Sequence, residues 1–337
     1  MIDLLVAGCG PAGATTAIRA ALAGLSVVVL EPRTGPIDKA CGEGIAHSAV
    51  DYLARLGVHP SGRPFHGIRY LDARHSVDAR FTAGPGLGVR RTTLHQALLD
   101  RLSELNVPID HTRIGPITQN DTSVTAAGHT ARYLAAADGL HSPIRRQLDL
   151  GGSTGAPRRG LRQHYRVSPW TDLVEVYWSG LGEAYVTPVA DNLVGVAILT
   201  TARGTFDSHL DAFPALKRRL CSAAPVSAVM GAGPLRQRVH RRVAGRVLLV
   251  GDAAGYIDAL TGEGIAVALR TSAELVDCVR VGRPADYEAA WRRVSRECRL
   301  LTASLLWARN RSLLAPHIVP AAARLPGVYA RIVNRLS

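Results

Sequence analysis

The distribution of apolar residues at the start of the chain predicts a strand, a helix and a second strand. Residues 1–7 and 26–30 are nearly continuous apolar runs, which is typical of strands buried on both faces of a parallel sheet. Residues 14–23 have the alanine-rich composition of a helix, and Gly24 ends it. This order predicts a βαβ unit and therefore an α/β domain with a parallel sheet.

Two later parts of the chain, residues 65–90 and 160–235, contain segments in which apolar and polar residues alternate. Alternation is the pattern of half-exposed antiparallel strands. Asp191-Asn192 predicts a hairpin turn between two of these segments. We expect them to form one antiparallel sheet, separate from the parallel one. The segments are 68–71, 77–81, 162–167, 173–178, 183–186 and 193–200.

Helical spacing of apolar residues dominates the chain after Pro284, and the helices are predicted at 287–307, 313–318 and 321–336. The last of these combines arginines with apolar residues, which leaves two interpretations. It is either a cover packed on the rest of the protein or a surface that touches a membrane or a lipid-like substrate. Shorter strands are predicted at 107–117 and 123–126, and a short helix at 212–221.

Composition and charge describe a globular protein and argue against nucleic acid as a partner. Of the 337 residues, 47% are hydrophobic and 20% are charged, which excludes a disordered chain. The net charge of +13 comes mainly from arginine, since Lys39 and Lys217 are the only lysines among the 40 basic residues. The arginines are scattered, with few aromatic residues between them, so we expect no nucleic-acid partner. An anionic substrate or a membrane surface remains open.

The cysteines and the N-terminus indicate a reducing compartment. The chain has five cysteines, an odd number, and no C-x-x-C spacing, which argues against a metal site or a disulfide framework. The apolar N-terminus lacks a basic region and carries Asp3, so we expect a strand there and no signal peptide. No run of about 18 uninterrupted apolar residues occurs. We expect a cytoplasmic protein, with a membrane-peripheral location as the alternative.

A glycine-rich turn joins the first strand to the first helix, with the spacing G-x-G-x-x-G, and Glu31 ends the second strand. In such a turn the first glycine allows the tight bend, the second admits a pyrophosphate to the backbone, and the third lets helix and strand pack closely. Glu31 would bind the hydroxyls of a ribose. The arrangement predicts a dinucleotide site, either for FAD or for NAD. Its turn residues are Gly8, Gly10, Pro11, Ala12 and Gly13.

A second candidate site follows the apolar run 247–250, where the strand ends in Gly251-Asp252 and Thr261 then precedes a helical pattern. A carboxylate at a strand tip can accept hydrogen bonds from ligand hydroxyls, and a helix N-terminus favours negative charge. A reduced flavin, with its ribityl hydroxyls and anionic ring edge, is such a ligand. The alternative is an ordinary strand–turn–helix in which Thr261 is the N-cap.

Other candidates are weaker when each is taken alone. Asp138-Gly139 follows a further predicted strand, but a turn with an N-cap would also explain it. Arg91 begins a predicted helix and could meet a phosphate or lie on the surface. The loop 33–45 contains Cys41 and Glu43. We interpret that loop either as an irregular crossover or as a segment lying against a flavin ring, with these two residues facing the substrate.

With these motifs in this order, the chain resembles the flavoprotein superfamily of para-hydroxybenzoate hydroxylase and geranylgeranyl reductase, and the resemblance covers nearly the whole chain. It implies an α/β fold: an FAD-binding Rossmann domain of the glutathione-reductase and para-hydroxybenzoate-hydroxylase type, an inserted antiparallel β-sheet substrate domain, and C-terminal helices. The expected FAD-binding domain comprises 1–64, 91–159 and 236–284, the substrate domain 65–90 and 160–235, and the helical cover 285–337.

The resemblance implies FAD as the cofactor and NAD(P)H as a transient electron donor. No second G-x-G-x-x-G is present, so NAD(P)H would have no Rossmann domain of its own. Tyr185 lies where the family often places an aromatic residue near the ring, and it joins Cys41 and Glu43 as a substrate-facing candidate. Beyond the glycine turn, the implied FAD residues are Glu31, Arg33, Arg91, Ile114, Asp138, Gly139, Asp252, Gly262, Gly264 and Ile265.

Two reactions are consistent with the resemblance. The first expectation is a monooxygenase that transfers oxygen from a flavin C4a-hydroperoxide to a small apolar or polyketide-like substrate. The alternative is an enzyme of the geranylgeranyl reductase type, which reduces carbon–carbon double bonds of an isoprenoid; residues 39–45, KACGEGI, look most like that branch. Halogenation is not expected, because neither Lys39 nor Lys217 lies where the family's halogenases carry their catalytic lysine. A binding protein that merely retains the fold is the third alternative.

Overall fold

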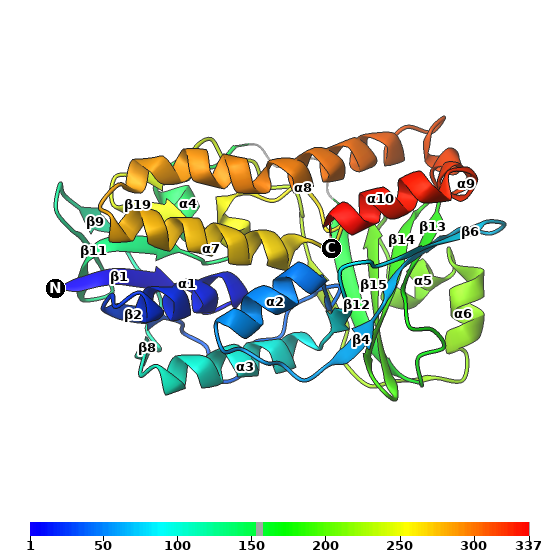
Figure 1. The fold of residues 1–337 in the computed structure, drawn as a ribbon, viewed down its shortest axis with the longest axis horizontal. Coiled ribbons are helices and arrows are strands. Elements are labelled where there is room, and N and C mark those ends of the chain that lie inside the picture. Colours follow the sequence, from blue (N-terminus) through cyan, green and yellow to red (C-terminus); the bar gives the residue numbers. More distant parts are fainter. Residues whose placement is uncertain (153–157, 337) are drawn as a thin grey trace.

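A parallel sheet forms one end of the molecule in the computed structural model, which describes residues 1–152 and 158–336 (Figure 1). Its strands run in the order β18-β19-β11-β1-β2-β8, and β1 is parallel to both β2 and β11. The predicted βαβ unit is therefore confirmed. The bounds are β1 (Ile2–Ala7), β2 (Val27–Leu30), β8 (Ile109–Asp110), β11 (His129–Ala136), β18 (Val243–Ala244) and β19 (Val247–Leu249), with β9 (Thr118–Gln119) and β10 (Val124–Ala126) paired beside β11.

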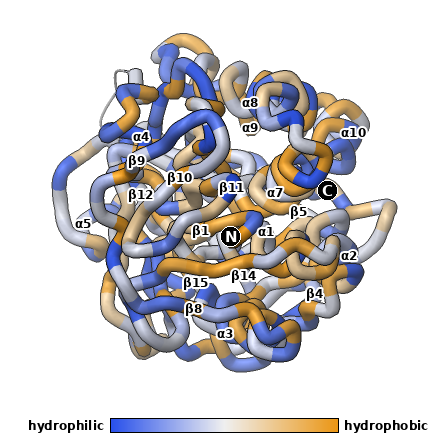
Figure 2. Tube along the Cα trace, turned by 90° about the vertical axis from the view of Figure 1, so that its left-hand side faces the viewer, coloured by the Kyte–Doolittle hydropathy of each residue, from blue (hydrophilic) through white to orange (hydrophobic). Residues whose placement is uncertain are grey.

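Helices bury the parallel sheet because its strands are apolar on both faces. Figure 1 shows α7 lying against α1 and α8 lying on α7. The helices α1, α7 and α8 are thus three successive layers. Viewed from the end, the apolar strands β1 and β11 lie at the centre (Figure 2). The helices are α1 (Pro11–Leu22), α2 (His47–Arg55), α3 (Arg91–Glu104), α4 (Pro143–Gln147), α7 (Gly264–Arg280) and α8 (Tyr287–Arg309), with short 3₁₀ turns η1 (Gly251–Ala254) and η2 (Pro284–Asp286).

A second sheet forms the other end of the molecule, in the order β16-β12-β15-β14-β13-β5-β6, with β17 beside β12 (Figure 1). Its pairs are antiparallel except β13 and β5, which are parallel. This differs from the expected fully antiparallel sheet. The reason is that the chain between β5 and β13 passes through the first sheet, whereas a hairpin would have made the two strands antiparallel. The strands are β5 (Gly67–Leu71), β6 (Ser76–Arg80), β12 (Arg159–Arg166), β13 (Val174–Ser179), β14 (Gly182–Ala190), β15 (Leu193–Thr200), β16 (Ala224–Pro225) and β17 (Met230–Ala232).

Helices cover both faces of the second sheet. On one face α5 (Phe206–Leu210) and α6 (Pro214–Leu220) bury an apolar cluster of the sheet. On the other, α10 (Pro326–Leu336) packs against β6. The three short strands β3 (Gly44–Ile45), β4 (Arg63–Phe65) and β7 (Gly86–Gly88) form a small sheet of their own. No helix among the described residues is long and apolar enough to cross a membrane.

The C-terminal helices differ from the prediction. The expected helices at 313–318 and 321–336 are replaced by η3 (Ala315–His317), α9 (Ile318–Arg324) and α10. The break falls at Leu325, since Pro326 has no N–H to donate and restricts the residue before it. Pro326 was a visible signal for this break. Of the expected domain segments, residues 153–157 and Ser337 lie outside the described part of the chain.

The strand predicted at 107–117 is also wrong over most of its length. Only β8 (Ile109–Asp110) is a strand, and the residues after it are irregular. The Asp110 carboxylate accepts hydrogen bonds from the N–H and the hydroxyl of Thr112 at 2.9 and 2.6 Å, which turns the chain. Ile114 therefore lies in a loop and not on the strand that was expected to flank an adenine.

Candidate functional site

The carboxyl ends of four parallel strands meet at one edge of the first sheet. Gly8 follows β1, Glu31 follows β2, Asp138 follows β11 and Asp252 follows β19. These strands are neighbours in the order β19-β11-β1-β2. In open α/β sheets this edge is where ligands bind. Four polar or glycine positions that are far apart in the sequence thus line a single site.

The glycine turn after β1 is packed on one side and open on the other. A Cβ on Gly8 would lie 2.5 Å from the Ala137 carbonyl oxygen, and one on Gly13 would lie 1.8 Å from the Gly8 carbonyl oxygen. At Gly10 the nearest atom is Arg91 Nη2, at 3.8 Å. Among the described residues no side chain caps the start of α1. Its first N–H groups are therefore available to an anion that approaches Gly10.

Glu31 marks one end of this site. Its carboxylate is buried and accepts hydrogen bonds from the Cys9 N–H at 3.0 Å and from Arg33 Nε at 2.7 Å. Burial alone would raise the pKa of Glu31, but these two donors outweigh it and lower the pKa, so the group is charged. A cavity of about 200 Å³ lies beside it, bounded also by His95 and His111. This is a place for a ribose and its base.

His95 is a residue that the sequence did not single out. Its Nδ1 accepts a hydrogen bond from the Ile37 N–H at 3.1 Å, so Nε2 carries the proton and donates to the Cys9 carbonyl at 2.7 Å. Burial lowers the pKa of His95, which keeps the ring neutral. The ring therefore joins the 33–45 loop to the glycine turn. Ile114, in contrast, does not bound the cavity.

Asp252 marks the other end of the site. Its carboxylate forms an ion pair with Lys39 at 2.8 Å. Burial raises the pKa of Asp252, but the charge and the hydrogen bond of Lys39 outweigh this and hold the pKa below its ordinary value. A charged carboxylate is thus kept at the strand tip. Lys39 brings the 33–45 loop against it.

Arg145 holds together the segments that follow β11 and β19. Its guanidinium is buried and donates to the carbonyls of Ala253 at 3.0 Å and Leu140 at 2.7 Å. The interpretation of this segment as a turn with an N-cap is realised by Ser142, which is the N-cap of the short helix α4. Asp138 accepts a hydrogen bond from the Ile144 N–H in the first turn of that helix, at 3.0 Å. Its second oxygen, Oδ1, is buried and has no hydrogen-bond partner in the part of the chain that the structure describes.

Comparison with known proteins identifies the family. Residues 1–175 match the sequence profile of a family described as an FAD binding domain. The chain belongs to this family. It is an FAD-dependent oxidoreductase of the superfamily that the motifs indicated.

Its relatives and structural neighbours extend over most of the chain. It is 28% identical over 329 residues to menaquinone reductase of Mycolicibacterium smegmatis, covering 86% of this chain and 79% of the relative. It is 26% identical over 316 residues to digeranylgeranylglycerophospholipid reductase 2 of Methanosphaera stadtmanae, covering 80% and 75%. The flavin-dependent brominase Bmp2 has a TM-score of 0.83 at 17% identity, covering 99% of this chain and 93% of that one. Halogenase PltM in complex with phloroglucinol and FAD has a TM-score of 0.74 at 19% identity, covering 88% and 73%. These structures confirm the fold class.

The residues at the strand tips fit FAD. The open backbone at Gly10 suits the pyrophosphate, and the cavity beside Glu31 suits the adenosine. Two buried polar atoms, Asp138 Oδ1 and Arg91 Nε, have no hydrogen-bond partner among residues 1–152 and 158–336. Bound FAD, with its phosphates and ribityl hydroxyls, offers partners to both. The contact of Asp252 with the ribityl chain stays a prediction.

The start of α7 differs in one detail from the prediction. The helix runs from Gly264 to Arg280 and its N-cap is Glu263. The Thr261 hydroxyl instead lies 2.8 Å from that of Thr302, so the interpretation of Thr261 as N-cap is wrong. A 17-residue helix starting here presents the positive end of its dipole, which would stabilise an anionic flavin edge. The expected ligands at this helix start are Gly262, Gly264 and Ile265.

The three substrate-facing candidates make internal contacts. Cys41 is partly buried, and its Sγ accepts a hydrogen bond from the Glu43 N–H at 3.4 Å. Glu43 is buried, and its carboxylate contacts β12. The Tyr185 hydroxyl donates to the Leu260 carbonyl at 2.7 Å, joining β14 to the loop after Asp252. Roles of these side chains toward a substrate stay predictions.

Two buried charge networks were missed by sequence reasoning. In the first, His164 Nε2 lies 2.7 Å from Glu43 Oε2, and Arg162 pairs with Asp38. A Cβ on Gly195 would lie 2.7 Å from Glu43 Oε2, so this glycine makes room for the carboxylate. The second network joins Arg158, Glu183, Asp258 and Arg309. The only sequence signal for the first was that Arg162 and His164, two apart on β12, share one face of the strand.

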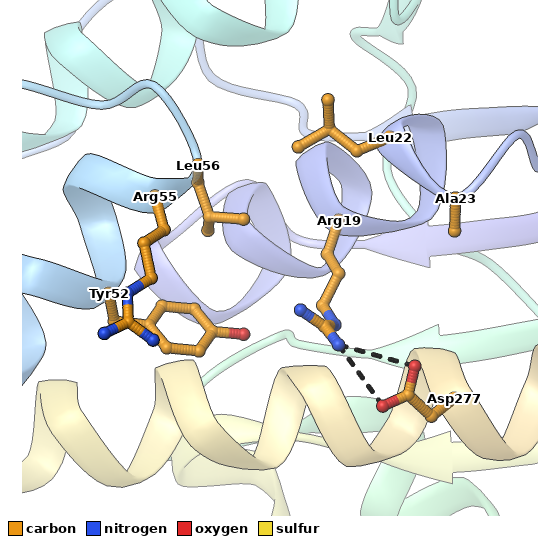
Figure 3. Close-up of a pocket in the computed structure, with 7 residues that line it drawn as sticks. All are labelled: Arg19, Leu22, Ala23, Tyr52, Arg55, Leu56 and Asp277. Carbon is orange, nitrogen blue, oxygen red and sulfur yellow. Dashed lines mark hydrogen bonds and ion pairs between the residues drawn. The ribbon is translucent and has the colours of Figure 1, made fainter.

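A larger hollow, of about 360 Å³, is unrelated to the strand tips. It lies between α1, α2 and α7, where Tyr52 and Arg19 point toward one another and Arg19 pairs with Asp277 at 3.2 Å (Figure 3). Arg19 belongs to the last turn of α1, whereas the glycine turn expected to bind the cofactor precedes its first turn. The hollow is therefore at the wrong end of the helix for the cofactor.

Replacing Asp252 by alanine is expected to weaken FAD binding about tenfold to hundredfold, because a hydrogen bond to a charged group contributes about 1.5–3 kcal/mol. Titration of flavin fluorescence measures the affinity. Asp191→Ala is the matched control, since that carboxylate is 98% exposed and pairs only with surface Arg63 in the described structure. Equal FAD affinity in the Asp252→Ala variant and the wild type would contradict the assignment.

Proposed function

We propose that the protein uses FAD to reduce a carbon–carbon double bond of an apolar, isoprenoid-like substrate. The observation that carries this proposal is the sequence similarity to reductases over about four-fifths of the chain. These relatives are named menaquinone reductase and digeranylgeranylglycerophospholipid reductase. The brominase and halogenase structures, at under 20% identity, share the fold alone. Reduction of a double bond, which was the alternative in the sequence analysis, is therefore preferred to the monooxygenase reaction.

An apolar cluster, which we call the inner cluster, supports a substrate of this kind. It is formed by side chains of the second sheet, of the loop after Asp252 and of helices α8 and α9. An isoprenoid chain has no polar groups and needs such a wall. Among its members, Tyr70 packs against Trp178 with 5.2 Å between ring centroids. The buried members include Leu140, Val176, Trp178, Leu199, Leu260, Leu306 and Val319.

The chain's own residues would bind, orient and exclude water, while FAD supplies the two electrons that the double bond takes up. We propose NAD(P)H as the donor that reduces the cofactor, so that the overall change is addition of two hydrogens to the substrate and oxidation of NAD(P)H. Glu31 and Asp252 hold the two ends of FAD. The hydrogen bond between Tyr185 and the Leu260 carbonyl joins β14 to the loop after Asp252, and both residues belong to the inner cluster.

We also propose separate roles for two parts of the chain. Residues 65–90 and 160–235 act as the substrate domain, because the second sheet supplies one wall of the inner cluster. Residues 285–337 act as the helical cover, because Leu306 and Val319 supply another wall.

Anaerobic turnover is the deciding measurement. With menaquinone or a geranylgeranyl lipid as the probe, we expect NAD(P)H oxidation and full product yield without O₂, and mass spectrometry should show a product heavier by two hydrogens. The Asp252→Ala variant, with its weakened FAD binding, is the control that shows turnover depends on this site.

The second candidate is the monooxygenase, which the Asp138-Gly139 motif and the compact second sheet favoured. A product that forms only in air and contains an added oxygen atom would establish it and overturn the reductase.

A further inference from the structure

The end of the chain has an unusual charge balance. Residues 298–337 contain six arginines and neither aspartate nor glutamate, whereas the chain as a whole has 27 acidic residues. The arginines Arg311, Arg324 and Arg331 are exposed. Arg309 and Arg335 pair with Glu183 and Glu297, which lie outside this segment, so the positive field at the surface comes from the other arginines.

The same segment carries most of the large apolar side chains that are exposed in the described structure. Leu313 is 84% exposed, Leu325 is 59% exposed and Trp307 is 57% exposed. Single exposed leucines are ordinary, but a group of them marks an interaction surface. We call this group the C-terminal face. It consists of Leu300, Trp307, Leu313, Leu325, Val328 and Ile332.

Helix geometry arranges these side chains in two stripes. Leu300 and Trp307 are seven residues apart on α8, which is two turns, and Val328 and Ile332 are four apart on α10. Figures 1 and 2 both show α8 and α10 side by side. Arg335 of α10 also pairs with Glu297 of α8 at 2.6 Å. The two stripes thus lie on neighbouring helices.

The inner sides of these helices are already used by the fold. Leu306 of α8 is buried in the inner cluster, and Tyr329 of α10 packs on β6. Trp307, next to Leu306, points outward, with the Arg311 guanidinium 5.2 Å from its ring centroid. The outward apolar residues are therefore not needed for the core, and the fold leaves them available to a partner.

We propose that the C-terminal face docks the protein on the surface of an anionic lipid bilayer. Tryptophan and leucine insert among headgroups and acyl chains, and arginines attract anionic lipid. A second copy of the chain is a poorer occupant, because two such faces would bring like-charged arginines together. The surface alone carries this inference, whichever reaction the site performs. For a lipid-like substrate it has a consequence: Leu306, in the inner cluster, lies one residue from Trp307 on the docking face.

Vesicle flotation tests the inference, with the FAD-loaded full-length protein and no substrate. We expect binding to phosphatidylcholine vesicles that contain phosphatidylglycerol, and weaker binding to pure phosphatidylcholine or at high salt. Leu313→Glu and Trp307→Glu should each reduce binding at least about tenfold, and Arg324→Gln about fivefold. The matched control is Leu22→Glu on α1, a leucine that is 49% exposed outside the face and should bind like the wild type.

Two results would overturn the inference. One is wild-type protein that does not float with either vesicle. The other is equal binding by the wild type and the Leu313→Glu variant, with both retaining FAD and the same melting temperature. Sedimentation that shows a dimer broken by Leu313→Glu would assign the face to a second copy and also overturn it. Because no turnover is measured, failure here is distinct from failure of the proposed reaction.

Discussion

Gly13→Ala is expected to give a protein without bound FAD and with a free energy of unfolding lower by about 3 kcal/mol. The added Cβ would lie 1.8 Å from the Gly8 carbonyl oxygen and 3.1 Å from the Ala137 Cβ. The first of these is a backbone atom, so no side-chain rotation relieves the overlap. Helix α1 must move away from β1, and the open backbone at Gly10 moves with it.

Flavin absorbance per protein after purification and urea unfolding together measure this effect. Gly180→Ala is the matched control, because among the described residues no atom lies within 4 Å of a Cβ built at that turn. That variant should retain FAD and the stability of the wild type. A yellow Gly13→Ala protein with wild-type FAD affinity would show that the turn does not bind the pyrophosphate.

Local chemistry explains which features the sequence predicts well. The glycine turn, Glu31 and Asp252 all sit at strand ends, and their spacing within one βαβ unit or one strand–turn–helix contains the necessary information. The long apolar runs likewise predict the parallel strands, and the helical spacing of apolar residues predicts α8. The wrong predictions have local causes too. Pro326 should have ended the preceding helix, and the Asp110 side chain turns the chain that was taken for a strand.

Long-range pairing explains what the sequence does not reveal. Glu43 and His164 are 121 residues apart, and Glu183 and Arg309 are 126 apart. Each residue belongs to a segment whose own pattern gives no sign of its partner. Their proximity depends on how the second sheet meets the 33–45 loop and α8, which no local pattern encodes. The contacts around the expected substrate position are of this kind, so the sequence predicts the cofactor end better than the substrate end.

Removal of the Glu43 carboxylate is the second change with a large expected effect. The Glu43 side chain is 1% exposed and joins its own loop to α3 and β12. Its Oε1 accepts a hydrogen bond from the Arg91 N–H at 3.0 Å, at the start of α3, and its Oε2 lies 2.7 Å from His164 Nε2 on β12. Arg162 Nη1 donates to His164 Nδ1 at 2.9 Å, so Nε2 carries the proton that is donated to Glu43.

Glu43→Ala should therefore lower the free energy of unfolding by about 3 kcal/mol, because the buried His164 Nε2–H and the Arg91 N–H lose their acceptor and Arg162 loses one of its two acidic contacts. Arg162, 1% exposed, would keep only Asp38 as an acidic contact in the described structure. FAD affinity should fall as well, since Glu43 orients the start of α3 beside the glycine turn. Urea unfolding and flavin titration measure the two quantities.

Glu43→Gly separates the carboxylate from the backbone. Glu43 has φ +59, in the left-handed region that costs a side-chain-bearing residue about 1 kcal/mol or more relative to glycine. Both variants lack the carboxylate, so Glu43→Gly should be more stable than Glu43→Ala by about 1 kcal/mol. Both should remain well below the wild type. If Glu43→Gly were as stable as the wild type, the carboxylate would contribute only about the 1 kcal/mol that removing the strained Cβ returns. The expected order, wild type above glycine above alanine, means that the protein holds a strained loop in place through its buried ion contacts.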